Sequence, residues 1–143
     1  MSFITPLMQQ IRYYGYKQTV TNSTATLQTT VYDMTGFESI TLLAGRQTTD
    51  ADTSSKLFFQ TGTASDSLGD VTGQQSIALT NIYLEMVRPG KRFVQGNFKT
   101  TASGVDTQQL IALLSGAKNL PTTQPASTTG KILYSPTSGN ASA

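Results

Sequence analysis

The chain has 143 residues, enough for one domain with its own hydrophobic core. Only 13% of the residues are charged and the formal net charge is +2, so we expect neither a highly charged disordered chain nor a strongly basic nucleic-acid-binding protein. Histidine and cysteine are absent, which excludes Ser-His-Asp and Cys-His nucleophile systems, zinc sites built from Cys and His, and disulfides. We therefore expect a folded protein that is not an enzyme and that needs no cofactor.

Threonine is the most frequent residue type, and 12 glycines accompany it. Because threonine is β-branched and suits a half-exposed pleated surface, this composition predicts strands and turns. No apolar run approaches the roughly 18 residues of a membrane-spanning helix. The N-terminus also lacks the basic start and long apolar stretch of a signal peptide. We expect no membrane partner.

The first segment, residues 1–10, is uncharged and is interpreted as an N-terminal arm. Thr5 and Pro6 are typical of a helix start, as N-cap and first helical residue. Packing of the arm on its own domain is the alternative to contact with a partner. The apolar residues of the arm are Phe3, Ile4, Leu7 and Met8.

Residues 11–118 show short alternating segments separated by turn signals, which indicates a β-sandwich domain. We expect strands at 12–17, 25–32, 40–45, 56–61, 76–80, 83–88, 91–100 and 108–115. The polar stretches 46–55 and 62–75 are expected to be loops. Pro89-Gly90 is typical of a type II turn and predicts a hairpin between the strands on either side. The most apolar strand, 108–115, is expected at the centre of a sheet and covered on both faces.

Alternation also assigns side chains to faces. Leu27 and Val31 are expected on one face, and Leu57 with Phe59 opposite Phe58. About eight strands with this spacing predict an all-β fold, an antiparallel β-sandwich or jelly roll. Residues 119–143 contain three prolines and are interpreted as an extended C-terminal tail, with room for one edge strand at the apolar residues 132–134.

Two clusters are candidates for contacts between subunits. Tyr13, Tyr14 and Tyr16 offer apolar area with a polar tip, which is common at interfaces, although an ordinary half-buried strand explains them equally well. Arg88 and Arg92 flank the Pro89-Gly90 turn. Basic residues beside phenylalanines can bind single-stranded nucleic acid, but we favour charges that face water or meet acidic residues of a neighbouring subunit.

The acidic residues Asp50, Asp52, Asp66 and Asp70 could hold Ca²⁺, but the spacing of an EF-hand is absent. Aspartate is common in loops for turn chemistry, so we favour solvated loops and expect no metal site. Two carboxylates would suffice for glycoside hydrolysis. Nothing places such a pair across a cleft, and the remaining acids, Glu38 and Glu85, lie in or beside predicted strands.

Several segments occur in a familiar order: FESITLL at 37–43, KLFFQ at 56–60, DVTG at 70–73, KRFV at 91–94, SGAKNLPTTQ at 115–124 and YSP at 134–136. Over residues 36–136 the chain resembles the jelly-roll-like decoration (cement) proteins of tailed-bacteriophage capsids. The resemblance implies a homotrimer on the outer surface of the virion, made in the host cytoplasm, that binds the major capsid protein and stabilises the shell. It suggests Phe3, Ile4, Leu7 and Met8 as capsid anchors and the tail as a second contact. The subunit-interface candidates are those named above: Tyr13, Tyr14, Tyr16, Arg88 and Arg92.

Two other functions remain open at this point. A phage fibre domain or host-glycan-binding module would use the loops 46–55 and 62–75. A tail-tube or connector subunit would form hexamers or dodecamers instead of trimers.

Overall fold

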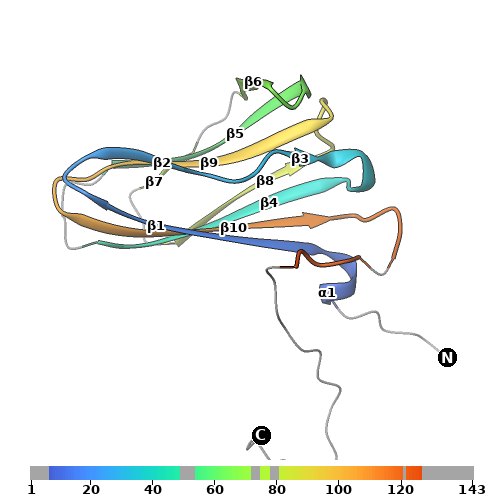
Figure 1. The fold of residues 1–143 in the computed structure, drawn as a ribbon, viewed down its shortest axis with the longest axis horizontal. Helices are drawn as coiled ribbons and strands as arrows, with labels where there is room; N and C mark the ends of the chain where they lie inside the picture. Colours follow the sequence, from blue (N-terminus) through green and yellow to red (C-terminus); the bar gives the residue numbers. More distant parts are fainter. Residues whose placement is uncertain (1–6, 49–53, 72–74, 78–80, 121, 127–143) are drawn as a thin grey trace, which may run out of the picture.

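The computed structural model describes residues 7–48, 54–71, 75–77, 81–120 and 122–126. The described residues form one short helix, one 3-10 turn and ten strands (Figure 1). The elements are α1 (Leu7–Gln10), β1 (Arg12–Thr21), β2 (Thr24–Gln28), β3 (Tyr32–Asp33), η1 (Met34–Gly36), β4 (Ser39–Thr48), β5 (Ser54–Ala64), β6 (Ser67–Asp70), β7 (Gln75–Ile77), β8 (Asn81–Val87), β9 (Phe93–Thr101) and β10 (Val105–Ser115).

The strands form two antiparallel sheets that pack face to face, which confirms the predicted β-sandwich (Figure 1). Sheet A has the order β1-β10-β4-β8, and sheet B has β2-β9-β5-β6, with β3 beside β9 and β7 beside β5. The two-stranded ribbon β1–β10 continues into the ribbon β2–β9 at one end of the molecule. Counting β2 with β3 and β6 with β7, each sheet has four positions, in the strand order of a jelly roll.

The core lies between the sheets and follows the predicted alternation. Ile40, Leu42 and Ala44 are buried on β4, and Leu57 and Phe59 are buried on β5. Phe58, between the last two, is only partly buried, as expected for the opposite face. The remaining core residues are Leu27, Tyr32, Met34, Phe37, Val94, Phe98, Leu110, Ala112 and Leu114.

At the end where the ribbons bend, the interior becomes polar. Asp106 and Gln108 face inward from β10 and are fully buried. One carboxylate oxygen of Asp106, Oδ2, accepts from the Thr100 hydroxyl at 3.1 Å and from Gln108 Nε2 at 3.2 Å. The other, Oδ1, is the one buried side-chain atom of the described residues that lacks a hydrogen-bond partner. Burying a carboxylate or an amide is costly unless it is hydrogen-bonded, so at this end of the sandwich hydrogen bonds between side chains stabilise the interior.

Three expectations about the strands were wrong. Residues 83–88 and 91–100 do not form a hairpin: β8 pairs with β4 in sheet A, and β9 pairs with β2, β3 and β5 in sheet B. The Pro89-Gly90 turn therefore crosses from one sheet to the other. The expected loops 46–55 and 62–75 are partly strand, since β4 reaches Thr48, β5 extends to Ala64 and β6 follows it. Their threonines and serines suit a pleated surface as well as a loop.

Other expectations are confirmed with changed bounds. The first strand continues to Thr21, and β10 lies between β1 and β4 at a central position of sheet A. The expectation that this strand is covered on both faces was wrong, because Gln109 is exposed and Ile111 and Leu113 are only partly buried on its outer face. The expected strand 25–32 is split into β2 and β3, so Val31 lies between them and not on the face of Leu27. Of the expected strand 76–80, residues 78–80 lie outside the described residues. No helix in the described part of the chain has the length and apolarity of a membrane span.

Candidate interaction surfaces

The segment after β10 returns to the start of the domain and binds the edge of β1. Gln124 reaches the main chain at three points: its Oε1 accepts from Tyr13 N at 2.9 Å, and its Nε2 donates to the carbonyl oxygens of Ile11 (2.7 Å) and Met8 (2.9 Å). Thr122 donates from its backbone N–H to Gln9 O at 2.8 Å and from its hydroxyl to Ile11 O at 2.7 Å. The segment that precedes the sandwich domain in the sequence and the segment that follows it are thus hydrogen-bonded to each other at one corner. There α1 and residues 122–126 lie side by side (Figure 1).

The predicted capsid anchors fall at this corner or outside the described residues. Leu7 is 65% exposed on α1, and Met8 is partly buried. Phe3 and Ile4 lie outside the described residues. The boundaries expected for an arm (1–10), a sandwich domain (11–118) and a tail (119–143) remain predictions, as does the role of these four side chains.

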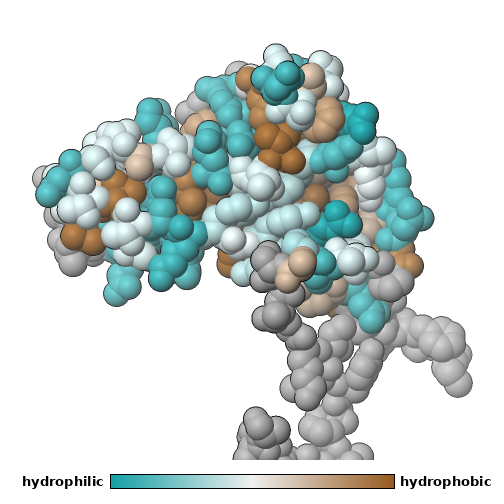
Figure 2. Space-filling model, viewed as in Figure 1, coloured by the Kyte–Doolittle hydropathy of each residue, from teal (hydrophilic) through white to brown (hydrophobic). Residues whose placement is uncertain are grey.

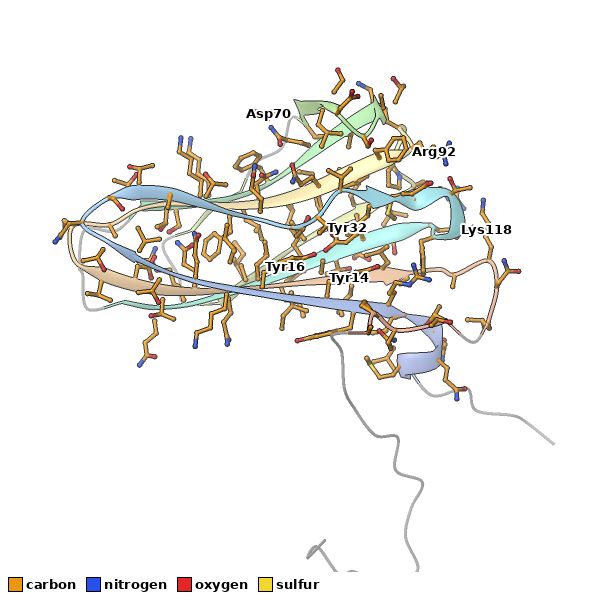
Figure 3. The ribbon with its side chains drawn as sticks, viewed as in Figure 1. Tyr14, Tyr16, Tyr32, Asp70, Arg92 and Lys118 are labelled. Carbon is orange, nitrogen blue, oxygen red and sulfur yellow. The ribbon has the colours of Figure 1, made fainter. Side chains whose placement is uncertain are left out.

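The three tyrosines of the first strand face in two directions. Tyr14 and Tyr16 point inward and pack on the core, with the Tyr14 and Tyr32 rings 4.7 Å apart (Figure 3). The hydroxyls of Tyr16 and Tyr32 are hydrogen-bonded at 2.6 Å. Burial, followed by the hydrogen bond to Tyr16, raises the pKa of Tyr32 far above its usual value. The structure thus gives Tyr14 and Tyr16 contacts within the domain, whereas Tyr13 lies on the outer face of sheet A, and a subunit interface at the three remains a prediction.

The outer face of sheet A carries a continuous set of apolar side chains. Ile111, Leu43 and Tyr83 are direct neighbours across β10, β4 and β8. Leu43 is 38% and Tyr83 is 68% exposed. In the next row, Leu113 lies opposite Tyr13 of β1. We call these five residues the outer patch.

A hollow of about 370 Å³ opens beside the outer patch, where Gly45 has no side chain, between Leu43, Tyr83 and Ile111. Seen from the side, as in Figure 2, the surface mixes hydrophilic and hydrophobic residues without one large hydrophobic area. The strand register places the outer patch on the outer face of sheet A. Consecutive apolar pairs, Leu42-Leu43 and Leu113-Leu114, were its signal in the sequence, because one residue of each pair must face outward.

The basic residues flanking the Pro89-Gly90 turn belong to a second hollow, of about 490 Å³. Arg92 donates from Nε and Nη2 to the carboxylate of Asp33, with a shortest distance of 2.7 Å. Hydrogen bonds from Arg92, then from Thr35, hold the pKa of Asp33 well below its usual range. Lys118 also lines this hollow and was missed from the sequence, since only the course of the chain after β10 brings it here.

The acidic residues are dispersed. Asp66 is exposed in the turn between β5 and β6, and Asp70 Oδ1 accepts from Gln60 at 2.7 Å. Glu38 borders the second hollow, beside the Pro89-Gly90 turn, whereas Glu85 lies on the outer face of sheet A. Asp50 and Asp52 lie outside the described residues. In the rest of the chain, no three Asp or Glu side chains gather as metal ligands would.

Sequence comparison with protein-family models and with curated proteins gives no match. Among solved structures, the fold is similar to that of a protein described as PBSX exported protein XepA, with a TM-score of 0.56 and 12% sequence identity. The similarity covers 94% of this chain and 47% of XepA, so the chain spans about half the length of that protein. At this identity the likeness concerns the fold, and it agrees with the two packed sheets described above.

Proposed function

We propose that this chain is a structural virion protein, a capsid decoration subunit that acts without catalysis on the outer surface of a phage head. The observation that carries the proposal is the outer patch. A small soluble domain rarely leaves a connected apolar face in water unless that face is an interaction site. In the decoration role, the outer patch packs against sister subunits of a homotrimer, and the corner formed by α1 and residues 122–126 faces the major capsid protein.

Two further observations support the proposal. The fold neighbour XepA is an exported protein of the phage PBSX. The joined corner would let two chain segments leave the domain together toward one partner. Several weak contacts made by a trimer add up to strong attachment, because each bound arm raises the effective concentration of the next.

The test compares heads of the encoding phage with and without the purified protein. We expect the protein to be a trimer by light scattering, to sediment with the heads and to raise the temperature at which they release DNA. The double variant Leu43→Lys/Tyr83→Lys should lose trimerisation and binding. Thr63→Lys/Ser65→Lys adds the same charge at exposed positions on and beyond β5 and should behave like the wild type. A monomer that ignores the heads would overturn the proposal.

A glycan-binding module is the second candidate, favoured by the hollow beside Tyr83. Tyr83 and Gln109 both line this hollow, and they offer a ring for stacking on a sugar and an amide for its hydroxyls. In that case the purified protein would bind host cells or a glycan array, and Tyr83→Ala would abolish binding. Binding to heads with no glycan signal would exclude this candidate.

A further inference from the structure

Four of the positively charged side chains of the described residues converge on the hollow at the Pro89-Gly90 crossover, at the end of the sandwich where Figure 3 shows Arg92 and Lys118. Its cations are Arg88, Lys91, Arg92 and Lys118, and its apolar lining includes Met34, Phe37 and Pro89. We propose that this cationic hollow is a binding site for an acidic peptide segment of a partner protein. The inference does not depend on which particle or surface the chain decorates.

The charge of the hollow is largely uncompensated. Between residues of the described ranges, Arg92–Asp33 is the only ion pair. Arg88, Lys91 and Lys118 are exposed and have no carboxylate partner among the same residues. Glu38 borders the hollow but forms no ion pair there. Three cations around one concave surface attract a segment with several carboxylates, and this attraction sets both partner choice and association rate.

Backbone hydrogen bonds hold the chain segments that carry these cations in place before any ligand arrives. Three segments are tied to residues 34–38 around η1: Met34 N donates to Arg92 O (2.8 Å), Arg88 N to Glu38 O (2.7 Å) and Lys118 N to Gly36 O (3.0 Å). Arg88 also has a φ of 52°, in the left-handed region that non-glycine residues rarely occupy. Such local strain is typical of sites where a side chain must be held in one direction. A preorganised site loses less entropy on binding.

The lining favours a peptide over a nucleic acid. Binding of single strands needs exposed aromatic rings for base stacking and a groove that follows the phosphates. Phe37 is only 9% exposed here, and the guanidinium of Arg92 lies over the Phe93 ring, 5.0 Å from its centroid. Met34 and Phe37 instead form an apolar floor, which suits the aliphatic part of glutamate side chains while their carboxylates reach the rim. A volume of about 490 Å³ has room for a few side chains.

The experiment titrates the purified protein with a hexaglutamate peptide at low salt and follows the backbone amide signals by NMR. We expect shifts confined to residues 34–38, 88–92 and 118, and weaker binding as salt increases. The variant Lys91→Gln/Lys118→Gln should reduce affinity by about three- to tenfold, the effect of removing two exposed charge partners. Both lysine side chains are exposed, and neither forms an ion pair with another described residue.

Lys56→Gln/Lys99→Gln is the matched control, because it removes two exposed cations that face each other across β5 and β9, outside this hollow. It should bind hexaglutamate like the wild type. Equal loss in both variants, no binding at low salt, or tighter binding of an oligothymidylate of the same charge would overturn the proposal. The proposal would also be overturned if the protein did not bind the peptide but associated with itself through Lys91 and Lys118 in a salt-sensitive way. A second copy of the chain would then be the occupant of the hollow.

Discussion

The side-chain amide of Gln124 binds the main chain of Tyr13 from 111 residues away, accepting from its N–H at 2.9 Å. The same amide donates to Ile11 O at 2.7 Å, so a side chain offers the edge of β1 an acceptor and a donor, as a neighbouring strand would. Unpaired edge groups invite association with other chains. Gln124 therefore covers one stretch of an edge and holds residues 122–126 beside the start of β1.

Replacing this amide should release the segment from the corner. We expect Gln124→Ala to lower the free energy of unfolding by about 1–2 kcal/mol, because it removes three hydrogen bonds of which part is replaced by water. Amide exchange at Tyr13 should accelerate, and proteases should cut after residue 120 more readily. Thr123→Ala is the control, because Arg12 Nε donates a hydrogen bond to the backbone oxygen of Thr123, which the substitution keeps. Equal exchange at Tyr13 in wild type and Gln124→Ala would contradict the proposed role of Gln124 in covering the edge of β1.

The contact between Gly96 and Leu42 determines how closely β9 of sheet B approaches β4 of sheet A. A Cβ atom at Gly96 would lie 2.5 Å from Leu42 Cδ2 and 2.8 Å from Cδ1. Gly96→Ala should therefore cost about 1–3 kcal/mol of stability by overpacking. Leu42→Ala alone should cost about 2–5 kcal/mol by leaving a cavity.

The double variant Gly96→Ala/Leu42→Ala separates this contact from other effects. Because the methyl group added at position 96 enters the space that the Leu42 side chain leaves, the double variant should cost less than the sum of the two single changes. Urea unfolding of the four proteins measures the difference. Additive costs would mean that the Gly96 substitution acts on the strand itself and not through Leu42.

The inner faces of the strands could be predicted from the sequence, and their connections could not. Leu57-Phe58-Phe59 shows the period of a strand whatever its partners are, and burial confirms the predicted faces. Pro89-Gly90 predicts only that the chain turns. Whether β9 returns beside β8 or crosses to the other sheet depends on pairing with β5, which is distant in sequence.

The candidate surfaces follow the same division. The outer patch could have been predicted from the sequence, because Leu43 directly follows Leu42 on a strand, and Leu42 faces the core. Only part of the cationic hollow could be predicted from the sequence. Arg88 and Arg92 are recognisable beside a turn, but Lys118 is placed near them by the hydrogen bond from its N–H to Gly36 O, which no local sequence pattern indicates. The tie between Gln124 and Tyr13 had no local signal at all.

The ion pair between Asp33 and Arg92 should give stability a specific dependence on pH and salt. Because the pKa of Asp33 is lowered in the folded state, the unfolded chain takes up the proton first as the pH falls. The contribution of the pair is complete at neutral pH, declines below about pH 4 and disappears only at more acidic pH.

Asp33→Asn and Arg92→Met are therefore expected to be less stable than the wild type at about pH 7, and this difference in stability should be clearly smaller at about pH 2. Both side chains are well exposed, so high salt should also reduce the difference at neutral pH. Chemical unfolding at these two pH values, with low and high salt, measures it. A difference of the same size at both pH values would mean that Asp33 acts through the η1 turn, where it accepts from Thr35, and not through its charge.

The buried hydroxyl of Tyr32 should limit stability on the alkaline side. Its pKa is raised in the folded state, so above about pH 10 the unfolded chain ionises while the folded domain keeps the proton. Stability should then fall by up to about 1.4 kcal/mol per pH unit. Tyr32→Phe removes the ionisable hydroxyl and should reduce the loss of stability with rising pH above about pH 10, although it also removes the hydrogen bond to Tyr16. Tyr83→Phe removes a phenol from the exposed face of sheet A instead and is the control. Identical alkaline profiles for the two variants would show that the buried tyrosine pair does not set the alkaline limit of the fold.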